Sequence, residues 1–146
     1  YVMRGAMPIR SLTYYMQQFW LPIGVRIAGH MMIPTVPFKE AYFFEDSLKF
    51  REAVKLPLVY VGGLLSREKI DMVLDAGFEG VSMARALLNE PDFVNRMGRE
   101  ENARNACEHA NYCIARMYSR EMACHKHIPD LPKKLLKELE SVSKKN

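Results

Sequence analysis

Two short turns carry residues whose types suit the binding of an anion. Gly62-Gly63 ends one apolar run of the chain, and Ala84-Arg85 ends a second one. A residue without a side chain lets backbone N–H groups approach an anion closely, and the planar guanidinium of arginine matches the oxygens of a phosphate. The two turns therefore favour a phosphate site. The alternative is that Gly62-Gly63 is only a tight turn and Arg85 a surface cation.

The apolar runs before these turns are predicted strands. Residues 56–61 read LPLVYV, a run too short for a typical helix and rich in β-branched and aromatic side chains. Such a run is typical of a strand buried on both faces. A second strand is predicted at about residues 80–83. Between the strands a helix should begin after Ser66, a good N-cap, and end at Gly77. Another helix is expected directly after Arg85, with its positive end toward the same space.

The order strand, helix, strand, helix predicts an α/β fold with a parallel sheet, and such folds bind ligands beyond the carboxyl ends of their strands. The run LPLVYVGG and the run GFEGVSMARALLNEPDFVNRM of residues 77–97 resemble the last two βα units of the old yellow enzyme family. The similarity extends upstream to residues 1–37 and downstream to Cys124. It is closest to the iron–sulfur-bearing branch related to 2,4-dienoyl-CoA reductase.

This resemblance implies the C-terminal portion of a (β/α)8 TIM barrel that binds FMN and uses NAD(P)H as co-substrate. The complete enzyme would pass hydride to an activated alkene or a similar small-molecule acceptor. Matched residue by residue, the positions that hold the FMN phosphate in the family are Gly62, Gly63, Ala84 and Arg85. The groups that polarise the substrate and donate a proton in the family lie mainly in the absent half of the barrel, so we assign no catalytic residue.

The resemblance also divides the chain into segments. Residues 1–38 would be a helical insertion after barrel strand six, and residues 39–98 the last two βα units with the preceding helix. Residues 99–128 contain the cysteines, and residues 129–146 form a lysine-rich C-terminal helix. Two strands cannot close a barrel, which needs about eight. We therefore expect a fragment or split-gene product whose partner is the N-terminal half of the barrel, in the same or a separate chain.

The first segment is rich in methionine and aromatic residues and is interrupted by prolines. Apolar residues at helical spacing predict one helix over residues 12–19 and a second one from about Ile23 to Met32, with Trp20 as a packing residue. A transmembrane span needs about 20 uninterrupted apolar residues, and polar residues such as Arg26 break this stretch. We expect no span. A helix that rests on a membrane surface or on a partner is the remaining alternative.

Residues 39–55 are predicted to form the helix before the first strand. Phe43 and Phe50 are spaced to lie on one apolar face, and Lys49 and Glu52 should point outward. We expect these phenylalanines to be core residues.

The cysteine segment departs from the pattern of the resembling branch. That branch has C-x2-C-x2-C and a more distant fourth cysteine, which together hold a [4Fe–4S] cluster through their thiolates. This chain has Cys107, Cys113 and Cys124, with Ala110 at the second position. Alanine cannot bind iron, and this substitution argues against a [4Fe–4S] cluster.

Three interpretations of the segment remain. A cluster could survive on the three cysteines, with a fourth ligand from water, His109 or His125. Zinc could use cysteine and histidine from the same set, including His127, although the spacing matches no standard finger. The third interpretation, which we favour, is that the cysteines are reduced thiols in a reducing compartment. The odd number of cysteines argues against a disulfide framework.

Composition bounds the function classes. The chain has 146 residues, a net charge of +4, nearly half apolar residues and about a quarter charged residues, which is ordinary for a globular protein. We expect no nucleic-acid partner, because no basic stripe is interleaved with stacking aromatics. No secretory signal is present at the start of this sequence, which favours a cytoplasmic location.

Two functional hypotheses follow. The first is an FMN-dependent NAD(P)H oxidoreductase to which this chain supplies the phosphate-binding turns. The second is a non-catalytic barrel remnant or interaction protein, whose methionine-rich first third would be an adaptable contact surface. A barrel that binds another phosphorylated ligand is a further alternative, because turn chemistry alone does not identify flavin.

Overall fold

The computed structural model of the chain describes residues 5–14, 16, 20–117 and 120–144. It divides into two compact units. The sheet unit comprises Lys39–Cys107, and the helical unit comprises Tyr1–Phe38 together with Glu108–Asn146.

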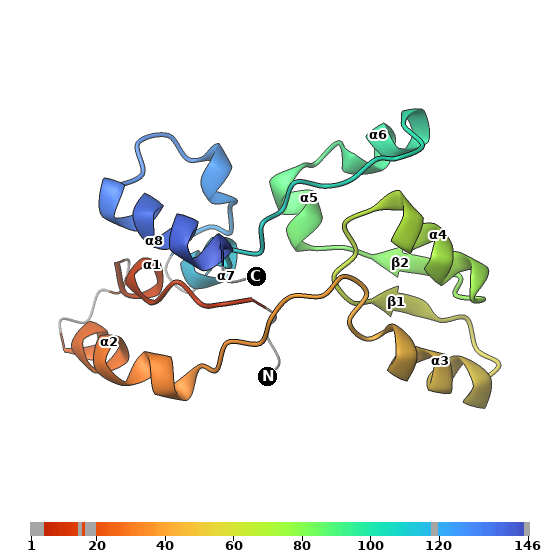
Figure 1. Cartoon of the computed structure of the whole chain (residues 1–146), viewed down its shortest axis with the longest axis horizontal. Helices are drawn as coiled ribbons and strands as arrows, with labels where there is room; N and C mark the ends of the chain where they lie inside the picture. The colour runs from red at the N-terminus through yellow and green to blue at the C-terminus, as the bar shows by residue number, and fades with distance from the viewer. Residues whose placement is uncertain (1–4, 15, 17–19, 118–119, 145–146) are drawn as a thin grey trace. The chain divides into compact units, whose positions relative to one another are not determined.

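The sheet unit is built on two parallel strands. β1 (Val59–Val61) pairs with β2 (Gly80–Ser82), so that Val59 lies opposite Gly80 and Val61 opposite Ser82. The two strands lie side by side in Figure 1, and their parallel pairing confirms the predicted order of strand, helix and strand. The helices of this unit are α3 (Phe44–Ala53), α4 (Arg67–Asp75), α5 (Arg85–Asn89) and α6 (Phe93–Arg99).

The connecting helix α4 begins and ends as its local sequence predicts. The hydroxyl of Ser66 accepts a hydrogen bond of 3.3 Å from the backbone N–H of Lys69, the standard N-cap contact. Gly77 follows the helix with φ of +88°, a conformation that glycine adopts without strain. The chain can therefore reverse direction within a few residues and enter β2 parallel to β1.

The core of the sheet unit lies on one face of the sheet. Tyr60 of β1 is only 1% exposed and packs with Ile70 and Val73 of α4, with Phe44 and Leu48 of α3 against the same cluster. Side chains alternate along a strand, so the neighbours of Tyr60 point the other way. Val59 and Val61 are 61% and 60% exposed. The prediction that this strand is buried on both faces is therefore wrong for the described chain, because the two helices pack on the Tyr60 side.

Helix α3 also differs from its prediction. It begins at Phe44 rather than near residue 39, because Ala41 has a positive φ of +54° and its backbone N–H donates to the carbonyl of Gly63 at 3.4 Å. Phe44 and Leu48 pack against the core from the helix, whereas Phe50 is 66% exposed. The assignment of Phe50 to the core is wrong.

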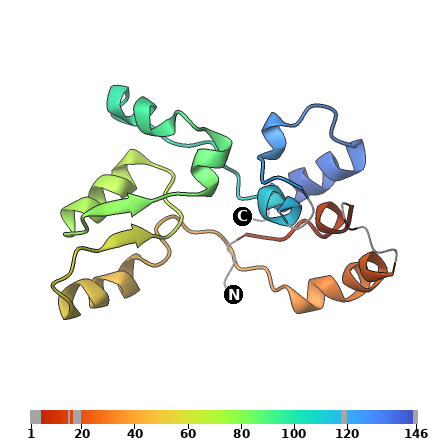
Figure 2. The ribbon, with the colours of Figure 1, turned by 180° about the vertical axis from the view of Figure 1, so that it is seen from behind.

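The helical unit joins the two ends of the described chain. α1 (Ile9–Tyr14) contacts α2 (Leu21–Met32), α7 (Tyr112–Arg116) and α8 (Lys133–Ser143), and a 3-10 turn, η1, spans His125–His127. The same helices are seen from behind in Figure 2. The core of this unit consists of Ala110, Tyr112, Leu131, Leu135 and Leu139.

Helix α2 confirms the second helix predicted in the first segment, but its surroundings differ from the prediction. Trp20, directly before it, is 63% exposed, so its expected packing role is wrong. Ile23, Ile27 and Met31, spaced four residues apart along α2, are exposed as well. α1 ends at Tyr14, and residues 15 and 17–19 of the first predicted helix lie outside the described residues. No helix in the described part of the chain is both long enough and apolar enough to cross a membrane.

Candidate functional site

The structure brings the four predicted phosphate-binding residues to one edge of the sheet. β1 and β2 are parallel and end in register at Val61 and Ser82, so their carboxyl ends lie at the same edge. Gly62 and Gly63 follow β1 directly. Ala84 precedes α5, and Arg85 is its first residue. Both turns therefore open at the edge where α/β folds bind their ligands.

Gly62 has a structural role that the sequence did not reveal. A Cβ atom at this position would overlap the hydroxyl and the ring of Tyr60. The Tyr60 hydroxyl donates to the Gly62 carbonyl at 3.3 Å and accepts from the backbone N–H of Phe43 at 3.2 Å. Burial raises the pKa of the Tyr60 phenol, which keeps it protonated as a donor. Packing of Tyr60 is therefore sufficient reason for a glycine at position 62.

Gly63 is required by the backbone. Its φ of +69° lies in the left-handed region, where a side chain is unfavourable. Its carbonyl accepts the hydrogen bond from Ala41, which ties the loop after β1 to the segment before α3. The glycine pair thus forms a defined turn.

Glu40 was not predicted as a site residue, yet it binds the same loop. One of its carboxylate oxygens accepts from the backbone N–H groups of Leu65 and Ser66 at 2.7 and 2.6 Å and from the Ser66 hydroxyl at 2.8 Å. The other accepts from Arg104 at 2.9 Å. Burial alone would raise the pKa of Glu40, but these hydrogen bonds and the charge of Arg104 lower it below its usual value. The loop after β1 therefore holds an internal anion, the Glu40 carboxylate, at Leu65 and Ser66.

A second segment fixes this loop from outside the βα units. The backbone N–H of Arg67 donates to the Ala103 carbonyl at 3.0 Å, and the backbone N–H of Asn105 donates to the Leu65 carbonyl at 2.6 Å. Ser66 and Arg104 form the antiparallel bridge between these bonds. The residues after α6 therefore return to the start of α4.

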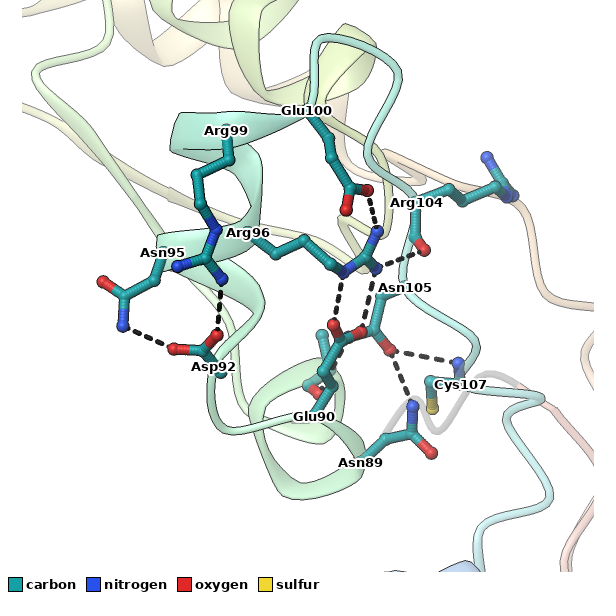
Figure 3. A network of polar contacts seen from close by, with 11 residues as sticks. Asn89, Glu90, Asp92, Asn95, Arg96, Arg99, Glu100, Arg104, Asn105 and Cys107 are labelled. Carbon is teal, nitrogen blue, oxygen red and sulfur yellow. Dashed lines mark hydrogen bonds and ion pairs between the residues drawn. The ribbon is translucent and has the colours of Figure 1, made fainter.

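Asn105 connects that segment to α5, as Figure 3 shows. Its amide nitrogen donates to the Ala86 carbonyl at 3.1 Å and to the Glu90 carboxylate at 3.2 Å. Its oxygen accepts from the Asn89 side chain at 3.2 Å and from the backbone N–H of Cys107 at 3.0 Å. Asn105 is buried, and this set of bonds satisfies its amide. Asn105 therefore links α5, through Ala86 and Asn89, to the segment after α6.

Arg96 of α6 completes the network in Figure 3. It binds the Glu90 carboxylate through two nitrogens at 2.5 and 3.0 Å, the Glu100 carboxylate at 2.7 Å and the Arg104 carbonyl at 2.8 Å. Hydrogen bonds from Arg96 to Glu90, and then to Glu100, raise the pKa of Arg96 above its usual value. The guanidinium therefore remains charged and joins α5, α6 and the segment after α6.

The helix dipole of α5 adds little positive charge beside Arg85. α5 is only five residues long, and no side chain caps its N-terminus at Ala84. Because the macrodipole requires aligned peptide units, a helix of this length contributes little of the expected positive end. Arg85 is half-buried and carries a permanent positive charge.

The predicted metal ligands fall into both units. Cys107 belongs to the sheet unit, and Cys113 and Cys124 belong to the helical unit. None of the three forms a disulfide. In the described part of the chain, no three side chains of histidine, cysteine, aspartate or glutamate are grouped in a way that could hold a metal ion. The three interpretations of the cysteine segment stay predictions.

The residues around the missing cysteine position pack in the helical core. Ala110 is buried beside Tyr112 and the leucines of the core cluster. His109 stacks on Phe38 with ring centroids 3.4 Å apart, and the Asn111 amide donates to the Ala6 carbonyl at 3.2 Å. Both His109 and Asn111 have positive φ values, +54° and +55°. The methyl group of Ala110 contributes apolar packing at this position.

His125, a predicted fourth ligand, lies edge-on to Tyr112, with centroids 6.1 Å apart. Burial lowers the pKa of His125, and the opposing charge of Glu108 only partly offsets this effect. Glu108 itself is paired with Lys126 at 2.8 Å and accepts from Ser143 at 3.1 Å. The hydrogen bond from Lys126 lowers the pKa of Glu108. Burial therefore favours the neutral form of His125.

Comparison with known proteins relates the chain to the oxidoreductases. Over 119 residues, or 82% of the chain, it is 34% identical to the 4,4'-dithiodibutanoate disulfide reductase of Rhodococcus erythropolis. The matched stretch covers 29% of that relative, so the chain spans less than a third of its length. No protein-family profile and no solved structure matches the chain.

Proposed function

We propose that this chain supplies the FMN phosphate-binding turns of an NAD(P)H-dependent oxidoreductase of the old yellow enzyme family. The observation that carries the proposal is the placement of Gly62–Gly63 and Ala84–Arg85 at one edge of a parallel sheet. Similarity to a reductase over most of the chain independently supports a redox function.

The exposed face of the sheet supports a barrel. Parallel sheets are normally covered on both faces, because their crossover connections place helices there or their strands close around a core. Here Tyr60 faces the helices, and Val59 and Val61 face outward. Strands from the N-terminal half of a barrel would pair with the two-stranded sheet and cover these valines. We propose that this half is the partner of the chain.

The residues present fit the phosphate end of FMN. Gly62 and Gly63 form a defined backbone turn, and Arg85 provides a cation with a planar fork of donors. FMN, when bound, supplies the hydride-transfer chemistry, and the protein binds and orients it. Gly62, Gly63, Ala84 and Arg85 would hold the phosphate, and the Asn105 network would keep the Arg85 turn in place.

Two observations suggest the substrate that accepts the hydride. The family resemblance favours an activated alkene, and the name of the relative favours a small organic disulfide. Reduction of a disulfide takes two electrons and two protons and yields two thiols, so one NAD(P)H and one proton balance the reaction. Consumption of NAD(P)H by the complete enzyme, measured with each acceptor in turn, distinguishes the two.

The test of the proposed function is FMN binding by fluorescence titration, on this chain and on a longer polypeptide that includes upstream coding sequence. We expect the longer polypeptide to bind FMN and Arg85→Ala to weaken the binding at least about tenfold, the loss of a charge-assisted phosphate contact. Arg99→Ala is the matched control, because Arg99 forms an exposed ion pair with Asp92 at 2.9 Å. Absence of FMN binding by the longer polypeptide, or an equal effect of both variants, contradicts the proposal.

The second candidate function is an interaction protein without catalysis. The exposed Trp20, Ile23, Ile27 and Met31 along α2 favour it, because large apolar side chains gathered on one helix mark contact surfaces. Two results together would favour this candidate over the first. The longer polypeptide would not bind FMN, and the Ile27→Glu substitution would abolish self-association in sedimentation experiments.

A further inference from the structure

The helical unit contains a groove between α1 and α8 that is separate from the proposed FMN site. Two cavities of about 380 and 580 Å³ form it. They share Ile9, Arg10, Lys134 and Glu138 in their walls, so they adjoin one another. Both volumes lie in the range of small-molecule sites, roughly 300–1,000 Å³.

The walls of the groove are rich in positive charge. Arg10 and Lys134 line both cavities, Lys137 lines the first and Arg26 lines the second. Among the described residues, no ion pair joins any of these four cations to a carboxylate. The Arg26 side chain is oriented by a hydrogen bond of 3.1 Å to the Thr13 hydroxyl. The groove therefore presents cations from three helices, α1, α2 and α8.

Among the described residues of these walls, Glu138 provides the single carboxylate, and this carboxylate is already engaged. One of its oxygens accepts from the backbone N–H of Arg10 at 2.6 Å, and the other accepts from the backbone N–H and the hydroxyl of Ser11 at 2.9 and 3.0 Å. These contacts use the carboxylate to bind the first turn of α1. The net charge of the described wall residues is therefore positive.

Apolar side chains line part of both cavities. Ile33 and Val142 line the first cavity and Leu135 the second, while Ile9 lies between them. We infer that the groove binds a small organic dianion, such as an aliphatic dicarboxylate, with one anionic group in each cavity and the aliphatic link along Ile9. This inference goes beyond the proposed function, which concerns other residues in the sheet unit.

Isothermal titration of the 146-residue chain with decanedioate tests the inference. We expect saturable binding of one ligand per chain. Decanoate, which carries one carboxylate, should bind about tenfold more weakly, because it places an anionic group in only one of the two cavities. Lys137→Glu should weaken decanedioate binding by about tenfold or more.

Lys133→Glu is the matched control. Lys133 lies on the same helix, is also exposed and gives the same change of net charge, but it lines neither cavity. Its effect should stay below about twofold. Circular dichroism establishes that each variant is folded, and Lys134→Gln replaces Lys137→Glu if the latter is not. The inference is overturned if the wild-type chain shows no saturable binding, if decanoate binds as tightly as decanedioate, or if both charge reversals weaken binding equally.

Discussion

Removal of the Glu40 carboxylate should open the loop after β1. Glu40→Ala leaves the backbone N–H groups of Leu65 and Ser66 without the acceptor that binds them at 2.7 and 2.6 Å, and it leaves Arg104 without its partner. Each hydrogen bond to a charged group contributes roughly 1.5–3 kcal/mol, and stranded buried donors cost roughly 1–3 kcal/mol each. Loop relaxation and water would recover part of this loss, so we expect a net destabilisation of the sheet unit of about 3 kcal/mol.

Hydrogen–deuterium exchange of peptides that contain Leu65 and Ser66 measures this effect directly, because those two amides lose their acceptor. Their protection should fall by roughly 100-fold, which corresponds to about 3 kcal/mol. Ser47, half-buried on α3, offers a control substitution, Ser47→Ala, that leaves the loop intact. Unchanged protection of the Leu65–Ser66 peptide in Glu40→Ala would refute the reasoning.

The Glu40 carboxylate should also make the stability of the folded protein depend on pH, with stability falling at low pH. The folded protein holds the pKa of Glu40 below its usual value of 4.5, so the unfolded chain binds the proton first. The stabilisation is therefore complete above pH 4.5 and is lost as the pH falls through the lower folded-state pKa. The difference in stability between the wild type and Glu40→Gln should follow this course in urea titrations. A difference that stays constant from pH 7 to about pH 2 would contradict the assignment.

Two further substitutions test the geometry of the carboxyl edge. Gly62→Ala should destabilise the sheet unit by about 1–3 kcal/mol, because the added Cβ overlaps Tyr60. Gly80→Ala, whose added Cβ would meet no atom within 4 Å, should cost less than about 1 kcal/mol in the same urea titration. Asn105→Ala should lower stability by about 2 kcal/mol, because it strands buried partners of the side-chain amide. The exposed Asn95→Ala should change the thermal midpoint little, and equal effects of the two asparagine substitutions would argue against the network in Figure 3.

Local rules were enough to predict α4 and the two strands around it. An N-cap at Ser66 and a left-handed glycine at Gly77 act within one turn of helix, so the nearby sequence contains the whole cause. The start of α3 was not predictable in this way. The chain before this helix is tied to the loop after β1 by the hydrogen bond between Ala41 and Gly63, which are 22 positions apart.

The residues that support the candidate site were missed for the same reason. Glu40 binds Leu65 and Ser66, and Asn105 binds Ala86, at separations that no periodicity or motif spans. A buried asparagine or glutamate gives only a general signal in sequence, because polar residues of these types are usually exposed. The exposure of Val59 and Val61 could not be predicted either, since an apolar run does not reveal what covers each face of its strand.

The structure also changes which residue can test the flavin proposal. Gly62 is needed for the packing of Tyr60, and Gly63 is needed for a φ of +69°. Both glycines would be required in a turn that binds no ligand, so their identity does not by itself point to phosphate. Substituting either one would disturb the loop and weaken any ligand indirectly. Arg85 is different, because it stands at the start of α5, where a hydrogen bond from Asn105 to the Ala86 carbonyl holds the backbone independently of the Arg85 side chain. A loss of FMN affinity on Arg85→Ala, with stability unchanged, therefore reports on the phosphate contact itself.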